Sequence, residues 1–399
     1  MKAPTMFVAG VLLSGLALAC SWSSRVLEAS PLSSQPLKAI VVKAAGSPVR
    51  ADWRVGAPIA FERLTVFPVI SDQPTASVDF ITLDQGLRSG KVIITELGAN
   101  GQTRRINRRQ ISDGAEVNRL ALTNNSGKAL VLIAGEMILG GKQDRIVGHD
   151  CVIEAGNVPV PFDVFCVEHG RWSGDSIFGQ GRGDGSGAGA GNGGGRGTGS
   201  GSGSGGGAGP AQDQGRIIAM TVAPMALPNI REKAQAKKSQ GDVWNAVSET
   251  VMVTATSSET LTLNSVYQDK RVNTRINNYE RAFKNKLSAG NIVGVVAAVG
   301  GKIVSADVFA SHALFQAYWP KMLKSYALEA VSTIDPSKQQ ANRIDAEAFL
   351  ARSQGTSDSD GKEGVYRIAE NQSSADASFE LQYTKKNPTL VHFNRVAKK

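Results

Sequence analysis

Histidine, cysteine and aromatic side chains are scarce in this sequence. Among 399 residues there are 4 histidines and 3 cysteines, and aromatic residues make up 6% of the chain. The histidines are His149, His169, His312 and His392. They show none of the short spacings that are typical of metal ligands, so we expect no metal and no cofactor.

A complete nucleotide-binding loop is also missing. Gly140-Gly141-Lys142 resembles part of the G-x-x-x-x-G-K-[ST] loop, but Glu136 stands where that pattern needs glycine. Gln143 stands where it needs a hydroxyl group, and no clear helix pattern follows. These differences exclude a phosphate loop of that type. The glycine turn with Lys142, Gln143 and Arg145 is then either an anion site or an ordinary basic hairpin turn.

Cys151 and Cys166 are the only cysteines in the interior of the chain. If Cys151–Glu154 and Val160–Val167 formed a hairpin, the two thiols would face one another, and a disulfide is one interpretation. Separate burial of two small apolar thiols is the other. A nucleophile made of Cys166 and His169 is not favoured, because no third group orients the histidine.

The apolar run at the N-terminus is too short to span a bilayer comfortably. Lys2 precedes Met6–Leu18, and Ala17-Leu18-Ala19 fits the small-x-small pattern that signal peptidase cuts. We therefore expect residues 1–19 to be a signal peptide and the mature protein to be exported, either periplasmic or secreted. Cys20 follows the cleavage site directly, so a lipid anchor at Cys20 is the alternative to simple cleavage.

Glycine is present in excess. The chain has 44 glycines, concentrated in residues 179–214, and such a run behaves as a flexible coil. It contains few arginines and no aromatic residue, so we do not expect it to bind nucleic acid. The composition divides the chain into a signal peptide (1–19), a disordered leader (20–56), a β-rich half (57–178), a Gly-rich flexible loop (179–214) and an α/β half (215–395).

Strand-forming residues dominate before the glycine run, and helical spacing dominates after it. Strand patterns cover 59–70, 92–96, 117–123, 129–139, 146–154 and 160–167, with a short helix over 83–88. Turn residues at 124–127 and 155–157 predict antiparallel hairpins. Helical spacing covers 231–253 and 279–287, strands flank Gly300-Gly301, and a helix capped by Ser311 follows. Closing strands are predicted at 366–369, 378–383 and 389–393.

Together these elements predict an α+β fold. An antiparallel β-rich N-terminal half would pack with a helix-rich C-terminal half, interrupted by the disordered Gly-rich loop. The closing strands need partners, and the sheet of the first half offers edges. This favours one integrated unit over two domains joined by the glycine run.

The densest unusual chemistry lies in Gly135–Arg145 and Phe165–Trp172. In a continuous strand over 129–139, Glu136 would share an apolar face with Leu132 and Ile138. Burial would raise the pKa of its carboxyl, as in a general acid or base; a structural salt bridge to a nearby basic residue (Lys142, Arg145 or Arg171) is the alternative. We expect the two motifs to meet in space. The ligand-binding candidates are Glu136, Lys142, Gln143, Arg145, Glu168, Arg171 and Trp172.

These motifs carry a resemblance to a known family. Val131–Ile146 and Phe165–Trp172, together with Gln240–Trp244 and Val293–Phe309, are similar to the bacterial ARG and rhodanese-phosphatase-superfamily-associated protein family. The likeness covers about 57–335. It implies no assigned activity and no catalytic residues. Because the family's name reflects genomic association with proteins of ADP-ribose or phosphate chemistry, it implies at most a nucleotide-like or phosphorylated ligand.

Three functions fit the sequence. The net charge of +9 favours anionic partners, so the first is an exported binding module for a nucleotide- or phosphate-like ligand or partner. The second is a hydrolase that uses Glu136 or Glu168 as acid or base. The third is a cell-envelope scaffold in which the motifs are structural. The partner would be an anionic small molecule or an envelope protein, with membrane contact only through a lipid at Cys20.

Overall fold

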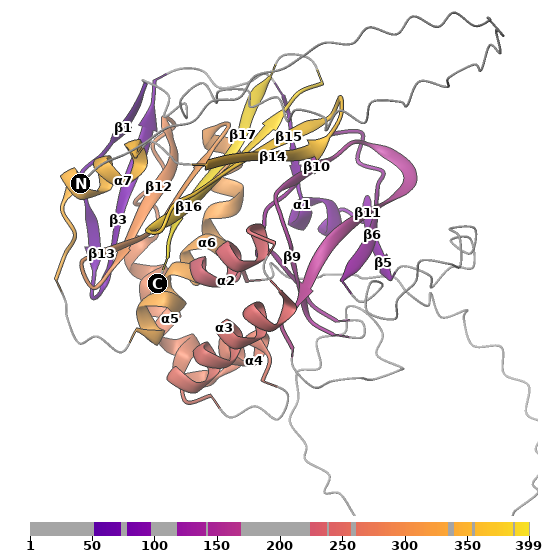
Figure 1. Ribbon diagram of the computed structural model, residues 1–399. Coiled ribbons are helices and arrows are strands. Elements are labelled where there is room, and N and C mark those ends of the chain that lie inside the picture. Colours follow the sequence, from indigo (N-terminus) through magenta and orange to yellow (C-terminus); the bar gives the residue numbers. More distant parts are fainter. Residues whose placement is uncertain are drawn as a thin grey trace, which may run out of the picture. The chain divides into compact units, whose positions relative to one another are not determined.

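The computed structural model describes residues 52–72, 78–96, 118–140, 143–168, 224–237, 239–256, 261–333, 339–352, 356–385 and 388–398. The signal peptide, the Gly-rich run and most of the leader lie outside these ranges. Antiparallel pairing dominates the sheets that contain the strands of the N-terminal half, and most helices come from the C-terminal half, so the α+β prediction is confirmed (Figure 1).

The largest sheet joins strands from both halves of the chain. Its order is β1-β3-β12-β13-β17-β16-β15-β14, with β2 also paired to β3, and every neighbouring pair is antiparallel. The strands are β1 (Trp53–Val55), β2 (Ile59–Phe61), β3 (Leu64–Ser71), β12 (Ile292–Val299), β13 (Lys302–Phe309), β14 (Thr356–Lys362), β15 (Tyr366–Gln372), β16 (Asp376–Tyr383) and β17 (Thr389–Ala397). The closing strands therefore reach β3 through β13 and β12, so the C-terminal strands extend a sheet that begins in the first half.

Folded chain begins earlier than predicted. The leader was expected to extend to residue 56, but β1 pairs with β3 in the register Trp53↔Ser71. Val55 is buried against the core, which explains why these few residues are ordered.

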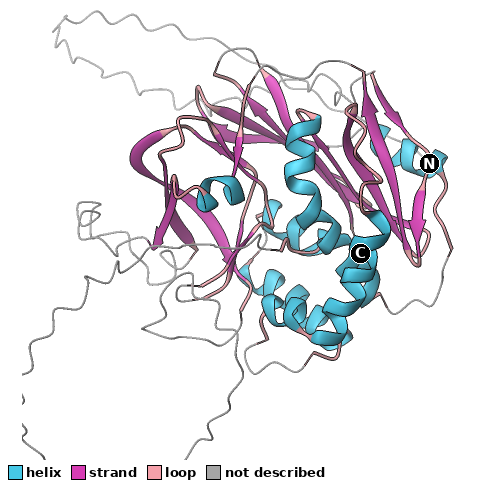
Figure 2. Cartoon of the chain, turned by 180° about the vertical axis from the view of Figure 1, so that it is seen from behind, coloured by secondary structure: helices cyan, strands magenta, loops and turns pink. Residues whose placement is uncertain are grey.

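The central strand β12 is buried on both faces, and its alternating side chains enter two different cores. Val295 and Ala297 belong to the core that includes the long helix α6 (His312–Ser332). Val296 and Ala298 belong to a second core, which includes α7 (Arg343–Ala351). Helices thus cover both faces of this part of the sheet, and Figure 2 shows the long helix lying against the strands. The sequence did not predict α7.

Two smaller sheets carry the motifs. One has the order β10-β7-β4 and contains a parallel pair, β4 with β7, and the other has the order β5-β6-β11-β9-β8. Their strands are β4 (Ile81–Thr82), β5 (Val92–Glu96), β6 (Arg119–Asn124), β7 (Leu130–Leu132), β8 (Met137–Ile138), β9 (Arg145–Val147), β10 (Cys151–Ile153) and β11 (Gly156–Cys166). A short helix, α1 (Leu83–Arg88), lies beside them and starts with a capping box between Thr82 and Gln85.

Four predictions of continuous elements were wrong. The expected strand 59–70 is a hairpin of β2 and β3, with Glu62 at a φ of 48° in the turn. The expected strand 129–139 is β7 and β8 separated by a turn, because Gly135 has a φ of 85°. The expected strand 146–154 is divided into β9 and β10. The expected helix 231–253 is α2 (Pro228–Gln235) and α3 (Gln240–Val253); α4 (Leu263–Gln268) and α5 (Lys270–Phe283) follow.

The hairpin expected to align the cysteines does not exist. Cys151 lies opposite Leu132, because β10 pairs with β7. Cys166 lies opposite Arg145, because β11 pairs with β9. Both thiols are free and buried, which is the second of the two interpretations that the sequence left open. Burial raises the pKa of each thiol and so keeps both protonated.

Among the described helices, none has the length and apolar character needed to cross a membrane.

Candidate functional site

Four of the predicted ligand-binding residues lie in the described part of the chain, and all four are buried. The exposed fraction is 0% for Glu136 and Arg145, 2% for Glu168 and 5% for Gln143. Lys142, Arg171 and Trp172 lie outside the described residues, so the structure does not place them. A ligand arriving from solvent would not reach the four side chains that are placed.

Glu136 is held by the long helix α6. Its Oε1 lies 2.7 Å from Nζ of Lys321, and its Oε2 accepts a hydrogen bond from the backbone N–H of Ile133 at 2.8 Å. Lys321 also pairs with Asp84 at 2.6 Å. Burial raises the pKa of Glu136, and the second carboxylate adds to this effect against the attraction of Lys321. One lysine thus serves two buried carboxylates.

Of the three salt-bridge partners expected for Glu136, Arg145 pairs with Glu96 and not with Glu136, and Lys142 and Arg171 lie outside the described residues. The sequence could have pointed to Lys321, since it stands beside Met322 and Leu323 in the predicted buried stripe of the helix. A lysine in that position needs a buried anion.

The described parts of the two motifs lie side by side, as expected. The backbone N–H of Asp144 donates to Oε2 of Glu168 at 3.1 Å, and the N–H of Val167 donates to the carbonyl of Asp144 at 2.9 Å. Arg145 pairs with Glu96 at 3.0 Å. We call this region, formed by Glu136, Gln143, Asp144, Arg145 and Glu168, the clasp. Its polar groups are engaged with one another or with neighbouring strands and helices, which is what a structural lock requires.

A second buried network lies beside the clasp and was not predicted. Asp307 on β13 pairs with Arg231 of α2 at 2.5 Å, and the Nε2 of His392 on β17 lies 3.2 Å from the same carboxylate. The Nδ1 of His392 lies 2.5 Å from Asp150, which follows β9. The side chains of Asp150, His392, Asp307 and Arg231 contact one another in this order, with charges of alternating sign. We call this set of four side chains the relay.

The relay stabilises the charged forms of His392, Asp307 and Arg231. Burial disfavours the charged imidazole, but Asp150 and Asp307 outweigh burial and raise the pKa of His392. Burial also disfavours an ionised Asp307, but Arg231 and His392 outweigh it and hold the pKa of Asp307 well below its usual range. Tyr326 and Ser305 donate further hydrogen bonds to Asp307. Buried alternating charges of this kind are tolerated because each is paired.

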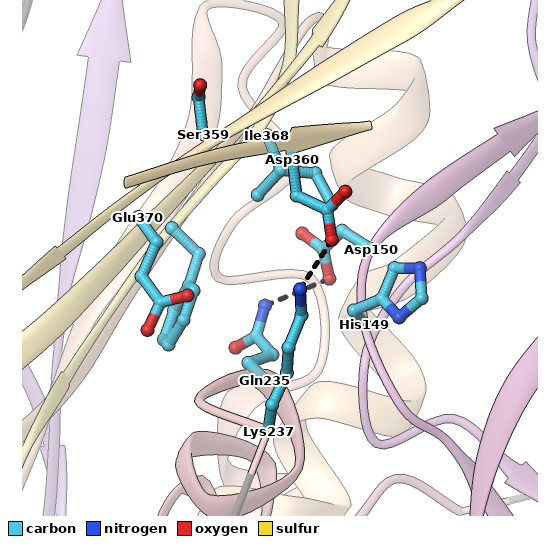
Figure 3. Close-up of a pocket in the computed structure, with 9 residues that line it drawn as sticks. His149, Asp150, Gln235, Lys237, Ser359, Asp360, Ile368 and Glu370 are labelled. Carbon is cyan, nitrogen blue, oxygen red and sulfur yellow. Dashed lines mark hydrogen bonds and ion pairs between the residues drawn. The ribbon is translucent and has the colours of Figure 1, made fainter. Parts of the chain in front are cut away.

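A small pocket opens beside the relay at Asp150 (Figure 3). Its lining comes from the end of α2, the segment between β9 and β10, and strands β14, β15 and β16. The lining residues are His149, Asp150, Gln235, Lys237, Ser359, Asp360, Ile368, Glu370 and Phe379. Lys237 pairs with Asp360 at 2.5 Å, and Gln235 donates to Asp150 at 3.1 Å. Its volume of about 20 Å³ leaves room for roughly one water molecule.

A wider depression lies elsewhere, between α1 and the turn that joins β6 to β7. Its volume is about 360 Å³, within the range of small-molecule sites. The polar residues that line it are Asp79, Gln85, Ser89, Lys91, Ser126 and Lys128. Lys91 and Lys128 outnumber the single carboxylate, Asp79, so the lining is net basic.

Within the described residues, no group of three or more His, Cys, Asp or Glu side chains is arranged to hold a metal ion.

Comparison with known proteins gives one match. The family model for the ARG and Rhodanese-Phosphatase-superfamily-associated Protein domain matches residues 52–184 and 215–396. The residues between the two matched segments fall in the Gly-rich run. No curated protein and no solved structure matches the chain.

Proposed function

Because the chain belongs to the ARG and Rhodanese-Phosphatase-superfamily-associated Protein family, we propose that it is a binding module for a small anionic ligand of the phosphate type. The family's name associates it with phosphatases, whose substrates carry phosphate groups. The net charge of +9 supports the same class of ligand, since a basic protein concentrates anions at its surface.

The observation that carries the proposal is the basic depression at Lys91 and Lys128. The two lysines lie at the same end of the β5–β6 pair, because Val92 is opposite Asn124 and the N–H of Asn125 donates to the carbonyl of Lys91. Ser89 and Ser126 place hydroxyl groups in the same lining. The two ammonium groups beside one depression suit an anion with several oxygen atoms, while the hydroxyl groups of Ser89 and Ser126 donate to the carbonyl of Gly86 and to Asn124.

Local hydrogen bonds fix this part of the chain before any ligand binds. The side-chain amide of Asn124 donates to the carbonyl of Lys128 at 2.8 Å, and the hydroxyl of Ser126 donates to Asn124. The ion pair between Lys128 and Asp79 is half-exposed or more on both sides. An exposed pair of this kind is weak, so an anionic ligand can compete for Lys128.

This proposal moves the ligand away from the clasp. The hydrolase hypothesis gains no support, because Glu136 and Glu168 are buried and engaged by Lys321 and by the backbone of Asp144. The mutual burial of the motifs is what the scaffold hypothesis expects of them, so we assign the clasp to fold stability.

The test is calorimetric titration of the protein with inorganic phosphate, pyrophosphate and ADP-ribose as probes. We expect at least one probe to bind, and the double change Lys91→Ala and Lys128→Ala to weaken it by about tenfold or more. The matched control is Lys284→Ala with Lys286→Ala, which removes the same charge from exposed positions after α5. Equal weakening in both doubles, or no binding by the unchanged protein, would contradict the proposal.

We also propose that the protein acts outside the cytoplasm, on the sequence of residues 1–20 alone. The test is mass spectrometry of the protein isolated from the membrane and soluble fractions of the cells that produce it. A mature N-terminus at Cys20 supports export, and a diacylglycerol mass on Cys20 identifies a lipoprotein. A retained Met1 would contradict it.

A further inference from the structure

The pocket beside the relay is chemically the opposite of the basic depression. Its lining contains the carboxylates of Asp150, Asp360 and Glu370, which outnumber the ammonium group of Lys237. Asp150 is 1% exposed and forms part of its inner wall. Asp150 is already paired with His392, so the carboxylates of Asp360 and Glu370 are the groups of this lining that attract a cation or a strong hydrogen-bond donor and repel an anion.

Gln235 supplies an independent sign that this pocket is built for a donor. Its side chain is 3% exposed, and its Oε1 makes no hydrogen bond within the described part of the chain. The Nε2 of the same amide donates to Asp150, which fixes the orientation of the group. In Figure 3 the nitrogen faces Asp150, and the oxygen points to the side of Glu370. A buried acceptor held in this way calls for a donor in the pocket.

Lys237 indicates which donor fits. Its Nζ lies 2.5 Å from Asp360 at the edge of the pocket, so the protein already places a primary ammonium group there (Figure 3). An ammonium group has three N–H donors and no acceptor, which matches a lining of carboxylates and one amide oxygen.

We propose that this pocket binds the ammonium group of a small primary alkylamine, and that Lys237 occupies the entrance until the amine displaces it. The volume of about 20 Å³ admits one ammonium head group and excludes a nucleotide. Ile368 and Phe379 form the apolar part of the lining, and the alkyl chain would extend from the head group through the entrance that Lys237 leaves. His392 and Arg231 balance the buried negative charge behind Asp150, so the site is stable before the amine enters.

The ion pair between Lys237 and Asp360 is one that an amine can compete for. The side chains of Lys237 and Asp360 are 62% and 54% exposed, and ion pairs this exposed are weak. Asp360 would exchange one ammonium partner for another. Asp150 and Gln235 would keep the positions that the relay and the end of α2 give them.

The test is titration of the full chain with butylammonium, and with tetramethylammonium as a cation of the same charge that has no N–H donor. Butylammonium should bind, and tetramethylammonium should bind at least tenfold more weakly. Lys237→Ala should tighten butylammonium binding by about tenfold, because the internal competitor is gone. Asp360→Asn should weaken it by a similar factor. Lys362→Ala, an exposed lysine on the same strand as Asp360, is the matched control and should leave binding unchanged.

Failure to bind butylammonium after Lys237→Ala would overturn the proposal and indicate that the pocket holds only water. Equal binding of both cations would overturn it as well, because general electrostatic attraction would then suffice. Neither result depends on Lys91 or Lys128, so the test of this pocket is independent of the test of the anion site.

Discussion

At the scale of single residues, Lys321 shows how burial and charge are reconciled in this protein. Its ammonium group is 2% exposed and lies between Glu136 and Asp84. Burial disfavours its charge, but the two carboxylates outweigh burial and raise the pKa of Lys321. Removal of this buried ammonium group should destabilise the protein more than removal of an exposed one, because two carboxylates would be left in the core without a compensating charge.

Lys321→Ala should therefore lower the free energy of unfolding by about 3–5 kcal/mol. Urea denaturation monitored by circular dichroism measures this change. Lys324→Ala is the control on the same helix, because Lys324 is one-third exposed and its pair with Glu280 is 3.7 Å long. It should cost less than about 1 kcal/mol. If the two changes cost the same, Lys321 does not hold the clasp.

Gly135 is a second residue whose identity is dictated by contact. It has a φ of 85°, and a Cβ built on it would lie 2.3 Å from the Cγ of Arg231. Arg231 is fully buried and paired with Asp307, so it has no room to withdraw. Only glycine at position 135 leaves space for the side chain of Arg231, which belongs to the relay.

Gly135→Ala should cost at least about 3 kcal/mol of stability, from backbone strain and overpacking together. Gly127 separates the two causes, because its φ is 77° but a Cβ there would meet nothing within 4 Å. Gly127→Ala should cost only the backbone strain, about 1–2 kcal/mol. Comparison of the two variants by thermal unfolding checks this, and equal losses would show that Arg231 does not restrict the site.

At the scale of elements, α6 connects the clasp to the large sheet. It packs on β12, supplies Lys321 and Tyr318 to Glu136, and supplies Tyr326 to Asp307. Its start is fixed by Ser311, whose hydroxyl accepts from the N–H of Leu314. The position of this one helix therefore affects both buried networks.

Ser311→Ala should destabilise the protein by about 1 kcal/mol, because it leaves a backbone N–H at the helix start without its acceptor. Ser332→Ala, at the other end of the same helix, removes a hydroxyl that only donates to the carbonyl of Glu329 at 3.3 Å, and it should cost less. Chemical denaturation of both variants measures the difference. A larger loss for Ser332 would contradict the assigned cap.

At the scale of the described fold, the relay ties three parts of the chain together. These parts are the segment after β9, helix α2 and the neighbouring pair of strands β13 and β17. Because the pKa of His392 is raised on folding, its contribution to stability is fully present below the unfolded pKa of about 6.5 and is lost as the pH rises through the folded pKa.

Stability of the unchanged protein should accordingly decline as the pH rises above about 6.5. The His392→Gln variant should be less stable than the unchanged protein at pH 6. Its free energy of unfolding should also decline less between pH 6 and pH 8. The cysteines contribute little to either slope, because the ordinary pKa of cysteine lies above this range. Urea denaturation at several pH values measures both slopes. Parallel slopes would show that His392 is not the titrating group.

The sequence alone predicted several helices, strands and turns that depend on neighbouring residues. The helix over 83–88, the strand over 92–96, the turn at Gly300-Gly301 and the cap at Ser311 were all predicted and are present. Each depends on residues within a few positions of one another, where periodicity, turn chemistry and capping act directly. The places where prediction failed, such as the turn at Gly135, depend on what packs against the backbone.

Only the tertiary structure decided which side chains form ion pairs with the buried charged residues. Glu136 was recognised as a buried carboxylate, but Lys321 lies 185 residues away, and His392 lies 242 residues from Asp150. No periodicity connects positions so distant; they meet because α6 packs on the sheet and β17 pairs with β13. The sequence therefore determined which stretches carry charge into the core, while packing decided that the motifs form a clasp, that the acidic pocket opens beside the relay and that the basic depression lies elsewhere.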